Sequence, residues 1–228
     1  MRGLILVLFT LFTTQLQAAG YTATYDMIWS VGIRLETEAT ETLVQQGTTW
    51  QMQLDAKASI GSANETTNLL FDPETGWTPL DYSYTQSVLG RTTGRHLRFN
   101  WNKRSLSRLH EPERSEIPLA DGALDPLGFR LQLAHLLSRG EAVPSEITLI
   151  DGDSVKTRAI AEDGQETIDT PLGPLDTLKF SLVESDPKRS FVFWLAPALN
   201  YQLVKLEKRD KRRLLALTLT SYTPAGTP

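Results

Sequence analysis

The sequence predicts a mainly β protein: a strongly curved antiparallel sheet, open or partly closed into a barrel, with one central α-helix packed on its concave face. Three observations support this class. Apolar and polar residues alternate in many short segments, and turns rich in glycine and proline separate those segments. One segment, 125–140, instead has the spacing and end signals of a helix. That helix is too apolar to be covered on one side only, so we expect the sheet to curve around it.

The first strand is predicted over 21–29, where every second position is aromatic or apolar. Gly32 then interrupts the pattern, which predicts a bulge or a bend before Ile33. The strongest alternation in the chain predicts a second long strand over 50–60. Its apolar positions are Trp50, Met52, Leu54, Ala56, Ala58 and Ile60.

The next strands are shorter. A strand predicted over 66–71 ends at a turn over 72–76, where proline and glycine supply turn geometry. Further strands are predicted over 82–89 and 95–101. A turn at 100–103 would then return the chain through 105–109.

The helix has clear signals at both ends. Asp125 is a good N-cap, Pro126 suits the first helical position, and Gly140 can adopt the left-handed conformation that ends a helix. One polar stripe consists of Gly128, Gln132, His135 and Arg139. Most of the remaining circumference consists of Leu127, Phe129, Leu131, Leu133, Leu136 and Leu137. We therefore place the helix inside the concave face of the sheet.

Strands resume after the helix. They are predicted over 147–150, 155–160, 166–170, 178–182, 191–195, 201–206 and 214–222. Asp151-Gly152-Asp153 is typical of a tight hairpin turn, and Pro171-Leu172-Gly173-Pro174 of a rigid one. The last three strands predict an antiparallel meander. We expect a single domain over 20–222 and a frayed tail over 223–228.

Residues 1–19 predict an export signal. Met1 and Arg2 precede an apolar run from Leu4 to Phe12, and small residues follow at Ala18 and Ala19, where a signal peptidase would cut. The run is too short to favour a retained membrane anchor. No cysteine follows it to accept a lipid. We therefore predict a protein of the periplasm that is exported through a cleaved signal peptide, is not lipidated, and has no transmembrane segment.

Composition excludes several classes of function. The chain has no cysteine, so disulfides, thiol chemistry and thiolate metal sites are absent. Its formal net charge of -4 provides no general attraction to nucleic acid. Two basic clusters interrupt the acidic chain and indicate either solvated hairpin ends or a surface for anionic partners such as lipid headgroups. They consist of Arg91, Arg95, Arg98, Lys103, Arg104 and Arg108, and of Lys205, Lys208, Arg209, Lys211, Arg212 and Arg213.

Catalytic signatures are missing. His96, His110 and His135 are far apart in the sequence, and none has the spacing that places two ligands on one metal. No G-x-S-x-G motif exposes a serine nucleophile. Asp151 and Asp153 are better explained by a hairpin turn than by a carboxylate pair. We therefore predict no catalytic residues, no metal and no cofactor.

Four short motifs resemble a known family. They are Tyr25-x-x-x-Trp29, Leu124-Asp125-Pro126-Leu127, Thr170-Pro171-Leu172-Gly173 and the strand from Phe191 to Ala196 around Trp194. Together they resemble the bacterial exported family called domain of unknown function 3108, over nearly the whole chain after the signal. The resemblance implies a β-rich envelope protein of Gram-negative type and brings no established activity. The expected shape is similar to the half-barrels of periplasmic lipoprotein carriers, which is an analogy of fold only.

The apolar residues inside the sheet allow two interpretations. In a tightly closed sheet they would fill a core at normal packing density. In an open sheet they would line a groove for an acyl chain, in which each buried methylene contributes about 0.8 kcal/mol. The candidate ligand-binding residues are Trp50, Met52, Leu54, Phe129, Leu133 and Leu136.

Three functions follow in order of preference. The first is a non-enzymatic periplasmic protein that binds or shields a hydrophobic envelope component, either lipid or lipoprotein. The second is an envelope scaffold or protein-interaction domain with a filled core and an envelope protein as partner. The third is a hydrolase that acts on envelope material. The basic segment from Arg91 to Arg108 would contact an anionic surface and allow peripheral contact with a membrane.

Overall fold

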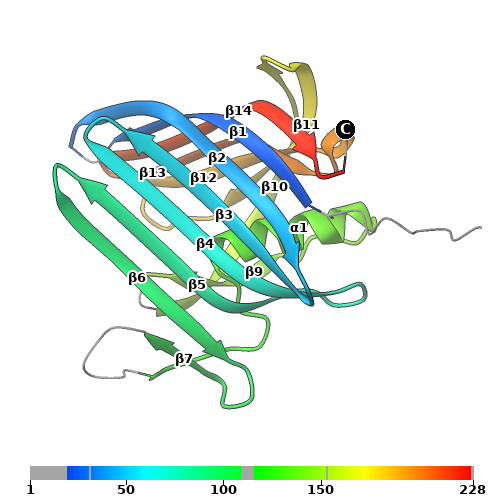
Figure 1. The fold of residues 1–228 in the computed structure, drawn as a ribbon. Helices are drawn as coiled ribbons and strands as arrows, with labels where there is room; N and C mark the ends of the chain where they lie inside the picture. The colour runs from blue at the N-terminus through cyan, green and yellow to red at the C-terminus, as the bar shows by residue number, and fades with distance from the viewer. Residues whose placement is uncertain (1–19, 31, 109–115, 153, 227–228) are drawn as a thin grey trace, which may run out of the picture.

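A computed structural model describes residues 20–226 except 31, 109–115 and 153 (Figure 1). The predicted signal peptide and the last two residues of the predicted tail lie outside these residues. The strands are β1 (Gly20–Ser30), β2 (Arg34–Gln46), β3 (Thr49–Ala58), β4 (Gly61–Asp72), β5 (Gly76–Val88), β6 (Arg91–Asn100), β7 (Ser105–Arg108), β8 (Glu116–Pro118), β9 (Glu146–Asp151), β10 (Ser154–Thr170), β11 (Gly173–Leu182), β12 (Arg189–Ala196), β13 (Gln202–Asp210) and β14 (Arg213–Pro224). The helices are α1 (Pro126–Ser138) and the short 3-10 helix η1 (Pro197–Leu199).

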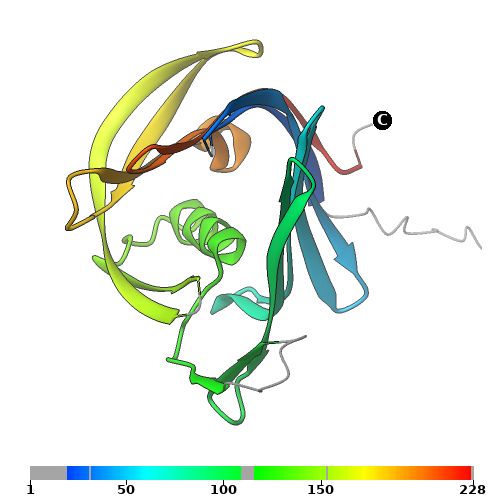
Figure 2. The ribbon, with the colours of Figure 1, turned by 90° about the vertical axis from the view of Figure 1, so that its left-hand side faces the viewer.

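All fourteen strands of the described chain form one antiparallel sheet in the order β8-β7-β6-β5-β4-β3-β2-β1-β14-β13-β12-β11-β10-β9. Two meanders, β1–β8 and β9–β14, join where β1 pairs with β14. The sheet curves around α1, which lies inside it (Figure 2). It is not closed, because β8 and β9 are its two edges. The predicted fold class is therefore confirmed.

The chain between β8 and α1 reaches the opposite edge of the sheet. The Leu124 N–H donates to the Thr148 carbonyl at 3.0 Å, and the Ile150 N–H donates to the Leu124 carbonyl at 2.9 Å. These bonds form one isolated parallel bridge to β9. Buried residues from both edges then pack in one cluster, which includes Leu97, Leu106 and Ile150. Side-chain packing thus spans the gap that backbone pairing leaves open.

Helix α1 begins and ends where the sequence predicts. The Asp125 side chain accepts from the N–H groups of Leu127 and Gly128, and Gly140 has a φ of +69° just after the last turn. Gly128 is needed for the fit of the helix against β4. A Cβ at this position would lie 3.0 Å from the Asp125 Oδ2 atom and 3.1 Å from the Leu69 Cδ2 atom, so a larger residue would crowd both the helix cap and β4.

The polar stripe of α1 holds the turn between β4 and β5. The Gln132 Oε1 atom accepts from the Trp77 N–H at 2.7 Å, and Arg139 donates to the Pro73 carbonyl at 2.9 Å. The His135 ring packs edge-on against Phe71 at a centroid distance of 5.3 Å. The stripe therefore joins the helix to a hairpin and fixes where the helix sits inside the sheet.

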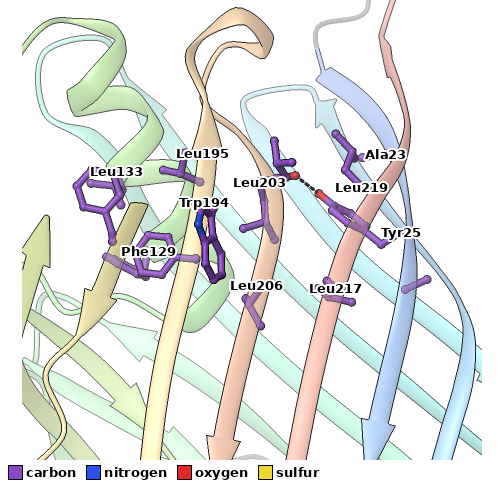
Figure 3. Packing of buried hydrophobic residues seen from close by; sticks show 14 of the residues in the cluster. Ala23, Tyr25, Phe129, Leu133, Trp194, Leu195, Leu203, Leu206, Leu217 and Leu219 are labelled. Carbon is purple, nitrogen blue, oxygen red and sulfur yellow. Dashed lines mark hydrogen bonds between the residues drawn. The ribbon is translucent and has the colours of Figure 1, made fainter. Parts of the chain in front are cut away.

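The largest cluster of buried apolar residues lies between α1 and the meander β12–β14 with β1. Phe129 and Leu133 of the helix lie on one side and Leu195, Leu203 and Leu217 on the other (Figure 3). Phe129 meets Phe193 edge-on at 5.7 Å, and Phe193 stacks on Phe180 at 5.7 Å.

No helix in the described part of the chain is both long enough and apolar enough to cross a membrane.

Some strand boundaries differ from the sequence prediction. Gly32 bends the chain as expected, but the bend reverses it, so that β2 runs antiparallel to β1. The two strands predicted over 155–160 and 166–170 are one strand, β10, whose pairing shifts register between Glu162 and Gly164. Strand β14 extends to Pro224, two residues beyond the predicted end of the domain, because Thr223 pairs with Thr22 and Pro224 with Tyr21.

Candidate ligand-binding site

A cavity of about 470 Å³ lies inside the sheet, between the first turns of α1 and one end of the strands. We call this end the open end. It carries the turns β1–β2, β3–β4 and β5–β6, which are on the left in Figure 1. The apolar lining comes from eight strands and the helix. It includes Met27, Trp29, Leu54, Ala56, Ala63, Phe129, Leu149, Ile150, Leu182, Phe191, Leu206, Leu215 and Leu217.

Small residues at matching register leave this space unfilled. Ala56 of β3 pairs with Ala39 of β2 on one side and with Ala63 of β4 on the other. Ala56 and Ala63 both line the cavity. Because alanine ends at Cβ, three neighbouring strands contribute almost no side-chain volume at this level. The sheet therefore keeps a hollow next to a core that is otherwise packed.

The polar lining is cationic. Among the described lining residues, seven are cations and three are carboxylates. The cations are Arg95, Arg130, Arg158, Arg189, Lys208, Arg209 and Arg213, and the carboxylates are Glu65, Glu184 and Asp210. Arg158 pairs with Glu184 at 2.7 Å and Arg189 with Asp210 at 3.0 Å. The excess positive charge lies near the open end, where β13 ends and β14 begins.

Glu65 is the carboxylate inside the cavity. Its Oε1 atom accepts from the Tyr82 hydroxyl at 2.6 Å. Burial raises the pKa of Glu65, although the hydrogen bond from Tyr82 and the nearby charges of Arg130 and Lys208 lower it. Burial also raises the pKa of Tyr82 well above its usual range. This pair gives the cavity wall one acidic position among apolar neighbours.

A buried ion pair holds the helix beside the cavity. Arg130 of α1 pairs with Glu41 of β2, and the Glu41 side chain is fully buried. Glu41 also accepts from the Tyr21 hydroxyl at 2.8 Å and from the Gln202 amide at 3.0 Å. Gln202 in turn donates to the Tyr25 hydroxyl at 2.7 Å. The network therefore connects the helix to β1, β2 and β13.

Burial changes the pKa values of the side chains in this network. Burial and the Glu41 carboxylate raise the pKa of Tyr21 and Tyr25 well above their usual range. Burial alone would lower the pKa of Arg130, but Glu41 and the two tyrosines raise it. Arg130 is therefore charged at neutral pH.

Asp125 caps the helix from a fully buried position. Its Oδ1 atom accepts from the Leu127 and Gly128 N–H groups at 2.9 Å, and its Oδ2 atom accepts from the Thr67 hydroxyl at 2.7 Å. Burial raises the pKa of Asp125 to about 6, although these hydrogen bonds lower it. The cap therefore titrates near neutral pH.

We expect Asp125→Asn to remove a pH dependence of stability between about pH 4 and 6. The folded protein binds the proton of Asp125 more tightly than the unfolded chain, so the free energy of unfolding falls as pH rises through this window. The full effect is about 3 kcal/mol for a shift from 3.8 to about 6. Urea unfolding of both proteins from pH 4 to 7 measures the difference.

Asparagine suits this test because it can still cap the helix. Its Oδ1 atom can accept from the Leu127 and Gly128 N–H groups. Its amide can donate to the Thr67 oxygen, while the Thr67 hydroxyl donates to the Asp81 carbonyl, 3.2 Å away. Glu65 is present in both proteins, and its charge contributes to the raised pKa of Asp125. Parallel pH profiles for the two proteins would contradict this role for Asp125.

The predicted ligand-binding residues divide among three places. Leu54 and Phe129 line the cavity. Met52 is buried in a separate cluster, and Trp50 packs edge-on against Trp77 at 5.5 Å beside it. Leu133 and Leu136 line a second cavity of about 250 Å³, between the C-terminal half of α1 and β9, and Phe129 lines both cavities.

The basic segment from Arg91 to Arg108 does not form one surface. Arg91 lies at the open end and Arg95 lines the cavity. Arg98 is exposed on β6, and Arg108 is the last residue of β7. Lys103 and Arg104 lie in the β6–β7 turn at the opposite end, where Arg104 pairs with Asp121 at 3.2 Å. The basic residues are far apart because β6 runs from one end of the sheet to the other, with Arg91 at its start and Lys103 just after its end.

Sequence reasoning missed Arg130, Glu41 and Glu65. Arg130 is the only charged residue in an apolar helix, between Phe129 and Leu131, and that contrast is a usable signal. Glu41 alternates in phase with Ala39 and Leu43, but no strand was predicted there. In the described part of the chain, no three acidic or histidine side chains gather closely enough to hold a metal ion.

Comparison with known proteins identifies the family and the fold. The family model described as "Protein of unknown function (DUF3108)" matches residues 21–211, so the chain belongs to this family. Among solved structures, the chain is similar to a β-barrel-like protein of domain of unknown function DUF1849 from Brucella abortus. The TM-score is 0.58 at 11% identity, over 91% of this chain and 98% of that one.

A weaker likeness joins this chain to a protein from Parabacteroides distasonis that is described as a candidate lipoprotein. The TM-score is 0.31 at 13% identity, over 91% of this chain and 96% of that one. No curated protein matches the chain. Because the identity to the Brucella protein is only 11%, that similarity shows the fold alone, a barrel-like sheet.

Proposed function

We propose that this member of the DUF3108 family is a non-enzymatic protein of the periplasm that binds the acyl part of a lipid or lipoprotein inside its sheet. The observation that carries the proposal is the cavity of about 470 Å³, with apolar walls and an excess of cations near the open end. Its volume lies within the range typical of small-molecule sites, about 300–1,000 Å³. The export signal predicted over residues 1–19 supports the compartment.

The distribution of charge supports one orientation of the ligand. The apolar walls would cover the acyl chain, and each buried methylene would contribute about 0.8 kcal/mol. An anionic headgroup would be attracted to Lys208 and Arg213 near the open end. Deeper in the cavity the wall is mainly apolar and offers less attraction to a headgroup. The chain therefore enters first and the headgroup stays at the open end.

We expect Ala63→Phe to weaken lipid binding by filling the cavity. A phenyl ring here displaces at least two methylenes of the ligand, so affinity should fall by about tenfold or more. The measurement is displacement of a fluorescent fatty acid, together with native mass spectrometry of protein purified from the periplasm. Binding of the fatty acid to the parent protein with a stoichiometry of one is the expected starting result.

Ser62→Phe is the matched control, because it places the same ring on the neighbouring residue, which faces the other side of β4. This variant should bind lipid as the parent protein does. A parent protein that is free of lipid when purified and takes up none when lipid is added would rule out the proposed function. Equal affinity in both variants would place any bound lipid outside this cavity.

A further inference from the structure

We propose that the open end of the sheet docks on the surface of a bilayer that contains anionic phospholipids. The docking surface consists of five turns that follow one another around the sheet: β11–β12, β13–β14, β1–β2, β3–β4 and β5–β6. Its apolar tips would enter the headgroup layer and its cations would contact lipid phosphates. This proposal goes beyond ligand binding and does not require the cavity to be occupied.

Large apolar side chains stand exposed at the tips of these turns. Ile33 is 37% exposed, Ile60 42%, Leu89 67% and Val183 54%. The Leu89 N–H donates to the Ile60 carbonyl at 2.9 Å, so two of the tips lie side by side. Exposed apolar side chains that gather on one surface are typical of interaction or membrane-binding sites, because water otherwise surrounds them. A headgroup layer would remove them from water.

The same turns carry excess positive charge. Among the described residues of the five turns, of the β9–β10 turn at the same end, and of the positions flanking them, seven cations accompany four acidic residues. The cations are Arg34, Arg91, Lys188, Arg189, Lys211, Arg212 and Arg213, and the acidic residues are Asp151, Glu184, Asp186 and Asp210. Arg34 also pairs with Glu36 at 2.7 Å. The Lys211 N–H donates to the Lys188 carbonyl at 2.9 Å, which brings the cations of two turns together.

The opposite end of the sheet lacks this combination. Among the described residues of its turns and their flanking positions, Lys103 and Arg104 are balanced by Asp72 and Glu74. Large apolar side chains are exposed toward this end as well, at Val44, Leu70, Phe71 and Leu172, but the turns beside them carry no excess of cations. Apolar tips together with excess cations therefore distinguish one end of the molecule. An anionic bilayer fits that end, because it attracts nearby lysine and arginine and accepts apolar side chains between its headgroups.

The docking surface lies at the end of the sheet that the cavity reaches. The cavity reaches the strand ends that carry these turns, at Ser30, Arg189 and Arg213. Docking would therefore place the opening of the cavity against the bilayer surface. A lipid could then move between the bilayer and the protein without its acyl chain crossing water.

Sedimentation with vesicles tests the docking surface. The protein should bind vesicles of phosphatidylglycerol and phosphatidylethanolamine, and binding should weaken as salt is raised, because exposed charges are screened. Leu89→Asn and Lys211→Glu should each weaken binding by about fivefold or more. Leu89 has a φ of +50° and asparagine tolerates this left-handed conformation, so Leu89→Asn should fold.

Leu172→Asn and Lys103→Glu are the matched controls at the opposite end, and both should bind vesicles as the parent protein does. Ala63→Phe should also bind vesicles normally, which separates docking from binding in the cavity. Absence of binding to these vesicles, or equal binding to phosphatidylcholine alone, would overturn the proposal. An equal loss of vesicle binding in the open-end variants and in the controls at the opposite end would overturn the proposal as well.

Discussion

Arg130→Met is expected to lower the free energy of unfolding by about 3–5 kcal/mol, because it leaves the Glu41 carboxylate buried without its cation. The Glu41 side chain is fully buried and that of Arg130 is 9% exposed, so water cannot replace the lost partner. Tyr21 and Gln202 would still donate to Glu41, but neutral donors do not offset the charge. Urea unfolding of the two proteins at neutral pH measures the loss.

Two further variants separate the ion pair from general damage to the helix. Arg139→Met makes the same substitution at the C-terminal end of α1, where the pairs with Glu74 and Glu141 and the hydrogen bond to the Pro73 carbonyl are all exposed to water, and should cost only about 1 kcal/mol. Glu41→Gln combined with Arg130→Met should recover part of the loss, since the buried charge is gone. A double variant no more stable than Arg130→Met alone would contradict this account of the pair.

The fold could be predicted because its signals are local. Asp125, Pro126 and Gly140 each act within one turn of the helix end, so the sequence shows both ends of α1 directly. Alternation is similarly local and predicts most of the strands. Where the local signal is polar the prediction fails: Glu36, Glu38 and Glu41 obscure β2, whose buried residues are Leu35, Ala39, Glu41 and Leu43.

The site could be predicted only in part, because it depends on which strands are neighbours. Leu54 and Phe129 were predicted and line the cavity, but the hollow itself arises from Ala56 and Ala63 at matching positions of two strands. Glu41 and Arg130 are 89 residues apart, so their pairing is invisible without the fold. The cations near the open end likewise come from β6, β10, β12 and the β13–β14 hairpin, which meet only in three dimensions.

Phe129→Ala is the second variant for which we expect a large effect, a loss of about 3–5 kcal/mol in the free energy of unfolding. The ring is 2% exposed and meets Phe193 edge-on, so alanine would leave a hole that the rigid sheet cannot close. Phe129→Leu keeps most of the volume and should cost less. Phe71→Ala removes a ring that is 37% exposed at the edge of the helix, and should also cost less.

Phe129 lines both cavities, of about 470 and 250 Å³, so its ring lies against each of them. Removing its ring should join them and make room for a longer acyl chain. A ligand that binds only the folded state raises the free energy of unfolding by RT ln(1 + [L]/Kd). Under the proposed function, a long-chain fatty acid should therefore stabilise Phe129→Ala more than it stabilises the parent protein. Thermal unfolding with and without the fatty acid measures this gain. If the fatty acid stabilises Phe129→Ala no more than the parent protein, the joined cavity is ruled out. The predicted role of Phe129 in packing would still stand.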